Sequence, residues 1–171
     1  MDENNVDTEQ KVSLERLEHM SAEQHVEGVL ESLTVRKPGS LEDLQACIQQ
    51  LDAELAARTD CRLVVIDSIA APVRRSDLPT AHSAALLMHV AQNLKRLAHE
   101  WNLAVILINQ VGGTEGAALG TSWHHCVTTR IQLELLDDGK RKATVVKSNE
   151  MQRGTTKEFR ITNRGIEMGE E

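Results

Sequence analysis

An acidic residue stands directly after a short apolar run in this sequence. The run is Leu63–Ile66, and Asp67 and Ser68 follow it. Such a run is typical of a strand covered on both faces, and strand ends open into the ligand crevice of α/β sheets. Because Mg²⁺ prefers hard oxygen ligands, Asp67 could hold this ion through water. A cap of the following turn also explains an acidic residue at this position.

A second apolar run, Ala104–Ile108, ends in the same way, at Asn109-Gln110. A carboxamide at a strand end could contact a γ-phosphate and change the loop that follows, Val111 to Gly120, when the nucleotide changes. Taken alone, the Asn-Gln pair also fits a polar strand terminus, and Gly112-Gly113 also fits a flexible linker. The combination of the two strand ends favours the nucleotide interpretation.

A third candidate, Glu9, lies in Val6-Asp7-Thr8-Glu9, just before a predicted helix. A carboxylate there could activate the water that attacks a γ-phosphate. The alternative is a favourable charge at a helix N-terminus. His124-His125-Cys126 suggests zinc, but adjacent residues do not form a tetrahedral site and no second ligand pair has suitable spacing.

The elements that must position these residues can be read from the periodicity of the apolar positions. Helical spacing of three and four predicts helices, and short β-branched runs predict strands. The upstream elements are a helix over about residues 13–27, a strand at 32–35, and a helix capped by Ser40 and Asp43. After them come the strand at 63–66, a helix over about 81–101 and the strand at 104–108. A strand, a crossover helix and a strand make a βαβ unit, so the last two strands should be parallel.

The last third of the chain changes to alternating strand patterns. The predicted strands are Thr129–Leu136, Ala143–Lys147 and Glu158–Thr162, with a turn at Asp137-Asp138-Gly139. We expect these strands to form an antiparallel end to the sheet.

Length and composition limit the class of protein. A chain of 171 residues with 40% hydrophobic and 26% charged residues is ordinary for one globular domain. No run approaches the roughly 18 to 20 apolar residues that span a bilayer, and the polar, acidic start is unlike a secretion signal. Three widely spaced cysteines fit reduced thiols better than a disulfide framework. A cytosolic or nuclear protein without membrane association is therefore expected.

The net charge of −7 argues at first against nucleic acid, but the charge is unevenly distributed. Residues 1–61 carry 14 acidic and 5 basic side chains, whereas residues 128–164 carry 9 basic and 5 acidic ones. A polyanion should therefore prefer the C-terminal third. Two solvated faces would give the same charge pattern.

Four motifs come in an order that is similar to one family, and the resemblance runs from about Val6 to Met168. The sequence resembles the RecA/Rad51 recombinase family and, within it, the Rad51 paralogues. The motifs resemble a strand-end catalytic glutamate with its helix, a Walker B strand, a sensor pair, and the segment that closes the second DNA loop. They are Val6-Asp7-Thr8-Glu9 with Ser13–Leu17, Leu63–Asp67, Asn109-Gln110, and Ala118-Leu119-Gly120-x-x-Trp123 with Thr128–Ile131.

The resemblance implies an α/β fold, a RecA-like P-loop NTPase core that is mainly parallel with an antiparallel C-terminal end. It also implies ATP and Mg²⁺ as cofactors. By this resemblance Glu9 orients the attacking water and Gln110 couples the γ-phosphate to the second loop. Asp67, Ser68 and Asn109 lie at the nucleotide, with Asp67 holding Mg²⁺ through water.

The resemblance further implies single-stranded DNA as a ligand. Arg74 and Arg75 begin the first DNA loop, Gly112 and Gly113 lie in the second, and Arg130 lies in the segment that closes it. The implied partners are other Rad51-family paralogues or the recombinase itself. The implied role is nuclear repair of double-strand breaks by homologous recombination.

The sequence departs from the family pattern in two ways. No Gly-x-x-x-x-Gly-Lys-Ser/Thr occurs, so the loop and helix that hold the β- and γ-phosphates are missing. We therefore expect one partial RecA-like ATPase domain over residues 1–171, truncated at its N-terminus, that does not hydrolyse ATP by itself and leaves sheet edges uncovered. The second loop is also short and has no lysine or arginine between Val111 and Ala118.

Two other functions remain open from the sequence. The missing phosphate-binding loop and the uncharged second loop favour a non-catalytic adaptor subunit of a paralogue complex, which would use the fold only to bind a partner. The other alternative is a bacterial or archaeal RecA-like regulator.

Overall fold

The computed structural model describes residues 3–9, 11–58, 60–78, 80–110, 119, 123 and 125–169. The chain divides into two compact units. The parallel unit comprises Met1–Val12 and Glu31–Cys126, and the antiparallel unit comprises Ser13–Leu30 and Val127–Glu171. Each unit is built around its own four-stranded sheet.

The sheet of the parallel unit has the strand order β2-β1-β3-β4, and every neighbouring pair is parallel. Its strands are β1 (Glu3–Asp7), β2 (Leu33–Arg36), β3 (Leu63–Asp67) and β4 (Ala104–Ile108). Asp7 pairs with Asp67, and Asp67 pairs with Ile108, so three strands end at the same level. The predicted parallel pairing of β3 and β4 is confirmed, and the polar residues that follow these strands share one edge of the sheet.

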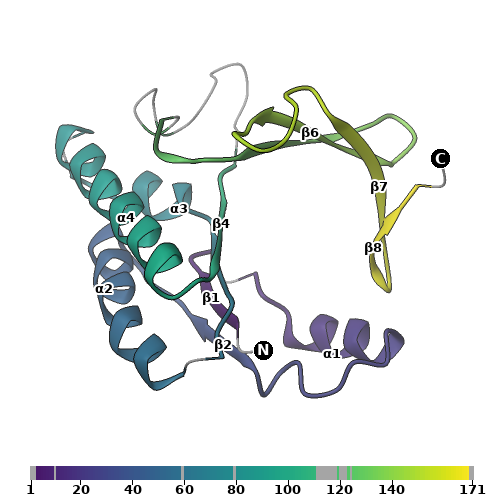
Figure 1. The fold of residues 1–171 in the computed structure, drawn as a ribbon, viewed down its shortest axis with the longest axis horizontal. Coiled ribbons are helices and arrows are strands. Elements are labelled where there is room, and N and C mark those ends of the chain that lie inside the picture. The colour runs from purple at the N-terminus through teal and green to yellow at the C-terminus, as the bar shows by residue number, and fades with distance from the viewer. Residues whose placement is uncertain are drawn as a thin grey trace. The chain divides into compact units, whose positions relative to one another are not determined.

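Two long helices, α2 (Leu41–Ala57) and α4 (Thr80–Glu100), lie side by side on one face of this sheet (Figure 1). The predicted capping box at the start of α2 is present, because Ser40 Oγ accepts from the Asp43 amide and the Asp43 carboxylate accepts from the Ser40 amide. The core between helices and sheet is built mainly of apolar side chains. Its most buried members include Val6, Leu44, Ile48, Leu51, Val64, Ile66, Val90 and Leu97.

The opposite face of the parallel sheet is open among the described residues. Side chains alternate between faces along a strand, so Val64 and Ile66 point to the helices. Ile106 and Ile108 of β4 point the other way and are 49% and 38% exposed. The continuous apolar runs suggested strands covered on both faces, and only the helix-covered face agrees with that expectation.

A short helix, α3 (Ala70–Arg74), follows β3 and was not expected from the sequence. Three of its five residues, Ala70, Ala71 and Pro72, are buried, so packing holds the helix in place. Its N-cap residue Ile69 makes no side-chain cap, and the Ala71 amide donates to the Ser68 hydroxyl instead. The helix carries Arg74 and Arg75 to the carboxyl edge of the sheet.

The antiparallel unit contains four strands in the order β5-β6-β7-β8. They are β5 (Arg130–Leu135), β6 (Arg141–Lys147), β7 (Thr156–Thr162) and β8 (Gly165–Met168). Three of them were predicted, and β8 was missed. They form a separate sheet, with no described strand pairing to the parallel sheet, whereas the sequence suggested an antiparallel end to one sheet. The fold class itself, a parallel α/β sheet with antiparallel strands at the C-terminus, is confirmed.

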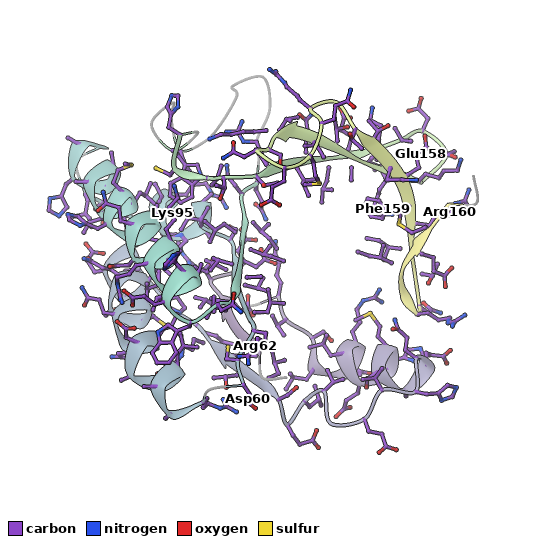
Figure 2. All side chains as sticks on the ribbon, in the orientation of Figure 1. Asp60, Arg62, Lys95, Glu158, Phe159 and Arg160 are labelled. Carbon is purple, nitrogen blue, oxygen red and sulfur yellow. The ribbon has the colours of Figure 1, made fainter. Side chains whose placement is uncertain are left out.

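One face of the antiparallel sheet is apolar. Figure 2 shows Phe159 on one side of β7 and Glu158 and Arg160 on the other. The exposed apolar residues on the same face as Phe159 are Ile131, Leu133, Leu135, Ile161, Ile166 and Met168. The strand alternation that was expected from the sequence is therefore present, with much of the apolar face open to solvent.

The helix of the antiparallel unit, α1 (Leu14–Glu23), ends earlier than the predicted residue 27. Gln24 is its C-cap, and His25 takes a left-handed φ of 55°, which cannot continue a helix. Arg16 and Gln24 donate side-chain hydrogen bonds to the carbonyls of Thr162 and Arg164, so α1 packs at the turn between β7 and β8.

Candidate functional site

The carboxyl edge of the parallel sheet is joined by a buried threonine-serine pair. The Thr8 hydroxyl donates to the Ser68 carbonyl and accepts from the Ser68 amide, both at 2.7 Å. The Thr8 amide also donates to the Asp67 carbonyl at 2.7 Å. Thr8 and Ser68 are fully buried, so the residues after β1 and β3 are fixed to each other.

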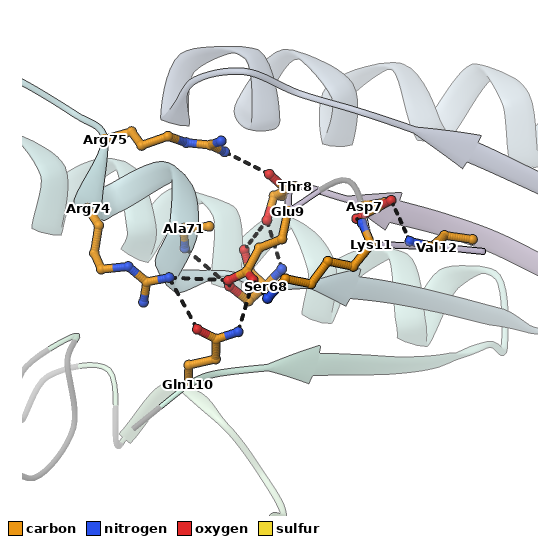
Figure 3. A network of polar contacts seen from close by, with 10 residues as sticks. All are labelled: Asp7, Thr8, Glu9, Lys11, Val12, Ser68, Ala71, Arg74, Arg75 and Gln110. Carbon is orange, nitrogen blue, oxygen red and sulfur yellow. Dashed lines mark hydrogen bonds and ion pairs between the residues drawn. The ribbon is translucent and has the colours of Figure 1, made fainter. Parts of the chain in front are cut away.

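The turn after β1 is set by Asp7. Its two carboxylate oxygens accept from the Lys11 and Val12 amides, each at 3.0 Å. An aspartate that bonds backbone amides ahead of it is a common way to hold a turn. This turn brings Glu9 and Lys11 to the carboxyl edge of the sheet (Figure 3).

Glu9 is the centre of a polar network in which all four of its partners point at its carboxylate (Figure 3). Oε1 accepts from Ser68 Oγ at 2.9 Å and from Arg74 Nη2 at 3.2 Å. Oε2 accepts from Gln110 Nε2 at 3.0 Å and is paired with Lys11 Nζ at 2.5 Å. The Glu9 side chain is only 10% exposed.

These partners change the acidity of Glu9. The hydrogen bond from Lys11 is the largest cause, followed by that from Ser68 and then Gln110, and they lower the pKa of Glu9 from 4.5 to about 2. Partial burial opposes this shift, since it disfavours the charged form. The pKa of Lys11 is raised by the same pair. In this arrangement Glu9 is a firmly held carboxylate.

Two arginines from α3 and its C-cap complete the site. The Arg74 guanidinium bridges Glu9 and Gln110, with a distance of 3.4 Å from Nη2 to Gln110 Oε1. Arg75 donates to the Thr8 carbonyl at 2.8 Å. Together with Glu9 and Ala71, the two arginines line a pocket of about 260 Å³.

Asp67 lies apart from this network. Among the described residues, none makes a hydrogen bond or ion pair with its carboxylate. Burial raises the pKa of Asp67, and the nearby charges of Glu9 and Asp7 raise it further. The charge of Lys11 opposes this shift without cancelling it. A carboxylate whose charge is disfavoured fits a bound cation, because a cation would offset that cost.

The fit of Mg²⁺ to the site rests on this carboxylate. Within the described residues no group of three or more His, Cys, Asp or Glu could hold a metal ion. Mg²⁺ usually keeps several waters and takes one or two carboxylates together with substrate phosphates. Asp67 can supply one such carboxylate. Beside it, the buried Oδ1 of Asn109 lacks a hydrogen-bond partner in the described structure, which leaves an acceptor for a ligand.

The structure brings together most of the residues singled out in the sequence. Glu9, Ser68, Arg74 and Gln110 are in direct contact, and Asp67 and Asn109 belong to the same sheet edge. Gly112 and Gly113 lie outside the described residues. Arg130 begins β5 in the antiparallel unit.

Three residues that hold the candidate site together were not singled out in the sequence: Asp7, Thr8 and Lys11. The sequence did contain a signal for them. An aspartate at the end of a strand can hold a turn, and a lysine two residues after Glu9 can then form an ion pair with it.

None of the described helices is long and apolar enough to cross a membrane.

The fold and the site define this protein as a RecA-like α/β core, with an aspartate, a glutamate and an Asn-Gln pair at the ends of parallel strands. A model of the Rad51 family matches residues 4–168. The chain therefore belongs to the Rad51 family.

Several relatives are similar to this chain. Mouse "DNA repair protein RAD51 homolog 2" is 31% identical over 141 residues, which cover 63% of this chain and 40% of the relative. "DNA repair and recombination protein RadA" of Metallosphaera sedula is 29% identical over 181 residues, covering 97% of this chain and 55% of the relative. The solved structure of the RadB recombinase matches with a TM-score of 0.84 and 26% identity, covering 99% of this chain and 79% of that one. The chain thus spans about two fifths to four fifths of these relatives.

Proposed function

We propose that this chain belongs to a Rad51 paralogue that acts in DNA repair by homologous recombination, in the nucleus, at double-strand breaks. Residues 1–171 would form one partial RecA-like ATPase domain. Its partners would be other Rad51-family paralogues or the recombinase, and single-stranded DNA. Family membership and the names of the relatives support the repair role.

The observation that carries this proposal is the convergence of Glu9, Ser68 and Gln110 at the ends of three different segments of the parallel unit. In hydrolysis of ATP, a water attacks the γ-phosphorus and the bond to the β-phosphate oxygen breaks. Glu9 would orient this water, and Gln110 would respond to the γ-phosphate. Both side chains already touch each other.

Asp67, Ser68 and Asn109 would face the nucleotide. When bound, Mg²⁺ would neutralise charge on the β- and γ-phosphates. Asp67 would hold its water ligands, for which its unpaired carboxylate is suited. The Ser68 hydroxyl donates to Glu9 and accepts from the Ala71 amide at 3.2 Å, so it would fix the angle of Glu9.

The proposed DNA contacts are those that the family resemblance implies. Arg74 and Arg75 would meet the backbone at the first loop, Gly112 and Gly113 at the second, and Arg130 in the segment that follows the second loop in the sequence. The basic excess of residues 128–164 supports such contacts, since phosphate contacts come from lysine and arginine.

Because the sequence has no Gly-x-x-x-x-Gly-Lys-Ser/Thr, the backbone donors that hold phosphates must come from elsewhere. We therefore do not propose that the 171 residues hydrolyse ATP by themselves. We propose that ATP binds weakly at the strand ends, in a manner that depends on Mg²⁺.

The test is an NMR titration of the isotope-labelled full chain with ATP, with and without Mg²⁺. The amides of Ser68 and Gln110 should shift only when both ATP and Mg²⁺ are present, and Asp67→Asn should remove the dependence on Mg²⁺. Lys95→Gln, a change of an exposed residue on α4, serves as the control and should behave as the wild type. Absence of any shift at the strand ends would contradict the nucleotide role.

A second function, a non-catalytic adaptor, is favoured by one observation. Both sheets expose large aliphatic side chains, such as Ile106 in the parallel unit and Leu133 in the antiparallel unit. Exposed apolar faces of this kind mark protein interaction surfaces. An adaptor would keep its repair function after Asp67→Asn, whereas a nucleotide-dependent protein would lose it.

A further inference from the structure

The carboxylate of Glu9 has no acceptor position left for a water molecule. An ionised carboxylate offers about four lone-pair positions, two on each oxygen. Ser68 and Arg74 occupy Oε1, and Gln110 and Lys11 occupy Oε2. Glu9 can therefore accept a proton from water only after one of these four partners leaves.

Two of the four partners lie closer to Glu9 than Arg74 does and are not part of the pocket lining. Ser68 is fully buried, its amide is bonded to Thr8, and its hydroxyl is also bonded to the Ala71 amide. Lys11 has a side chain that is 66% exposed, but it forms the shortest contact with Glu9, at 2.5 Å. A ligand in the pocket would therefore meet neither of these two side chains first.

Arg74 is the partner held least. Its contacts to Glu9 and Gln110 are the longest of the network, at 3.2 and 3.4 Å, and its side chain is 49% exposed. Gln110 is exposed too, but it forms a shorter bond to Glu9, at 3.0 Å, and Arg74 holds its carbonyl oxygen. Removal of Arg74 would thus loosen Gln110 as well.

Arg74 also faces the pocket of about 260 Å³ together with Arg75. The guanidinium group matches the oxygens of a phosphate and is hydrated weakly, so it binds phosphate in preference to many other anions. Glu9 is a wall of the same pocket. A phosphate in the pocket would therefore compete with the Glu9 carboxylate for Arg74.

We infer that Arg74 is a phosphate-operated clamp on Glu9. A phosphate group in the pocket draws the guanidinium away from Oε1, which frees one carboxylate oxygen for a water proton and releases the carbonyl of Gln110. The inference rests on the proposed function for the water reaction that Glu9 serves. The ligand is recognised as a phosphate group, and its source is either a nucleic-acid backbone or a free phosphate.

The experiment follows the side-chain Nε–H signal of Arg74 by NMR in the labelled full chain at constant ionic strength. Inorganic phosphate is titrated in one series and a short oligothymidylate in the other. The signal should move in a saturable manner, and the carboxyl carbon signal of Glu9 should move with it at the same concentrations. A response to oligothymidylate at far lower concentration identifies the nucleic-acid backbone as the source, and equal responses per phosphate identify free phosphate.

The variant Glu9→Gln tests whether the Glu9 carboxylate competes with phosphate for Arg74 or only helps to hold Arg74 in place. It removes the competitor, so phosphate should bind Arg74 about two- to fivefold more tightly, as expected for loss of a partly exposed ion pair. Asp77→Asn is the control for charge, because Asp77 is exposed, lies three residues after Arg74, and has no recorded contact with it among the described residues. Its effect should be clearly smaller.

The inference is overturned if the Arg74 and Glu9 signals of the wild type respond to neither probe, or if phosphate binding is unchanged or weaker in Glu9→Gln. Neither probe is a nucleoside triphosphate. Failure of ATP to bind would therefore refute the proposed function and leave the clamp standing, while a silent Arg74 would refute the clamp alone.

Discussion

The two faces of the parallel sheet have similar aliphatic residues but different surroundings. On one face, Val64 and Ile66 are covered by α2 and α4 and are essentially inaccessible to solvent. On the other, Ile106 and Ile108 remain exposed. The sequence of a strand shows whether its two faces are apolar. It does not show which of the two faces is covered, because that depends on the rest of the polypeptide.

The largest effect is expected on the covered face. Ile66→Ala removes a side chain with no solvent exposure from the middle of the core. It should lower the free energy of unfolding by about 2 to 5 kcal/mol, as for other large-to-small core changes. Urea unfolding followed by circular dichroism measures this value, and a loss below about 1 kcal/mol would show that the core is not packed as described.

A smaller loss is expected at the link between β1 and β3. Thr8→Val removes both hydrogen bonds to Ser68 and leaves the Ser68 amide and carbonyl buried without them. The cost should be about 1 to 3 kcal/mol in the same assay. Thr129→Val is a matched control, because the exposed Thr129 hydroxyl makes only a 3.5 Å contact with Ser148. Equal costs for the two variants would refute the role of Thr8.

The network around Glu9 predicts a dependence on pH. The pKa of Glu9 is lowered from 4.5 to about 2, so its charged form is stabilised in the folded chain. That stabilisation is present above about pH 4.5 and is lost as the pH falls through about 2. The difference in unfolding free energy between wild type and Glu9→Gln should therefore shrink over this range. A difference that stays constant with pH would contradict the ion pairs of Glu9.

The ionised side chain of Asp67 should have the opposite effect on stability from that of Glu9. Its pKa is raised by burial and by neighbouring negative charges, so its ionised form destabilises the fold at neutral pH. Asp67→Asn should increase the midpoint of urea unfolding at pH 7 modestly, and the gain should fall as the pH drops through the raised pKa. A loss of stability at pH 7 would mean that Asp67 has a stabilising partner.

The smallest effect is expected on the open face. Ile106→Ala makes the same chemical change as Ile66→Ala but at an exposed edge-strand position. It should cost less than about 1 kcal/mol, since little burial is lost. A cost as large as that of Ile66→Ala would show that this face is covered in solution.

The strand ends could be predicted from the sequence because their signal is local. Two apolar runs each stop at a polar residue, and a βαβ unit brings parallel strand ends to one edge, which placed Asp67 and Gln110 correctly. The capping box of Ser40 and Asp43 was equally local. The order of the motifs along the chain also made it possible to predict the family.

The partners of Glu9 could not be predicted in the same way. Lys11 reaches Glu9 because Asp7 holds the intervening turn, and Arg74 reaches it because a short buried helix follows β3. Neither the turn nor α3 has a periodic pattern. Strand β8 was missed for a related reason, since its four residues are too few to show an alternation.

The open faces were a further limit of the sequence. An apolar strand predicts burial, and it does not identify the covering segment. The exposure of Ile106 and Leu133 depends on parts of an assembly or polypeptide that strand patterns do not describe. A paralogue partner, as in the proposed function, would be one way to cover them.

The measurement that tests the central claim most directly is a complementation assay in cells of the source organism that lack this gene. Asp67→Asn is the decisive allele, because the raised pKa of Asp67 predicts that this change does not destabilise the fold. The account predicts that cells with Asp67→Asn have normal protein levels and lose resistance to double-strand breaks, while Lys95→Gln restores resistance fully. Full resistance with Asp67→Asn would contradict a nucleotide-dependent role at the strand ends.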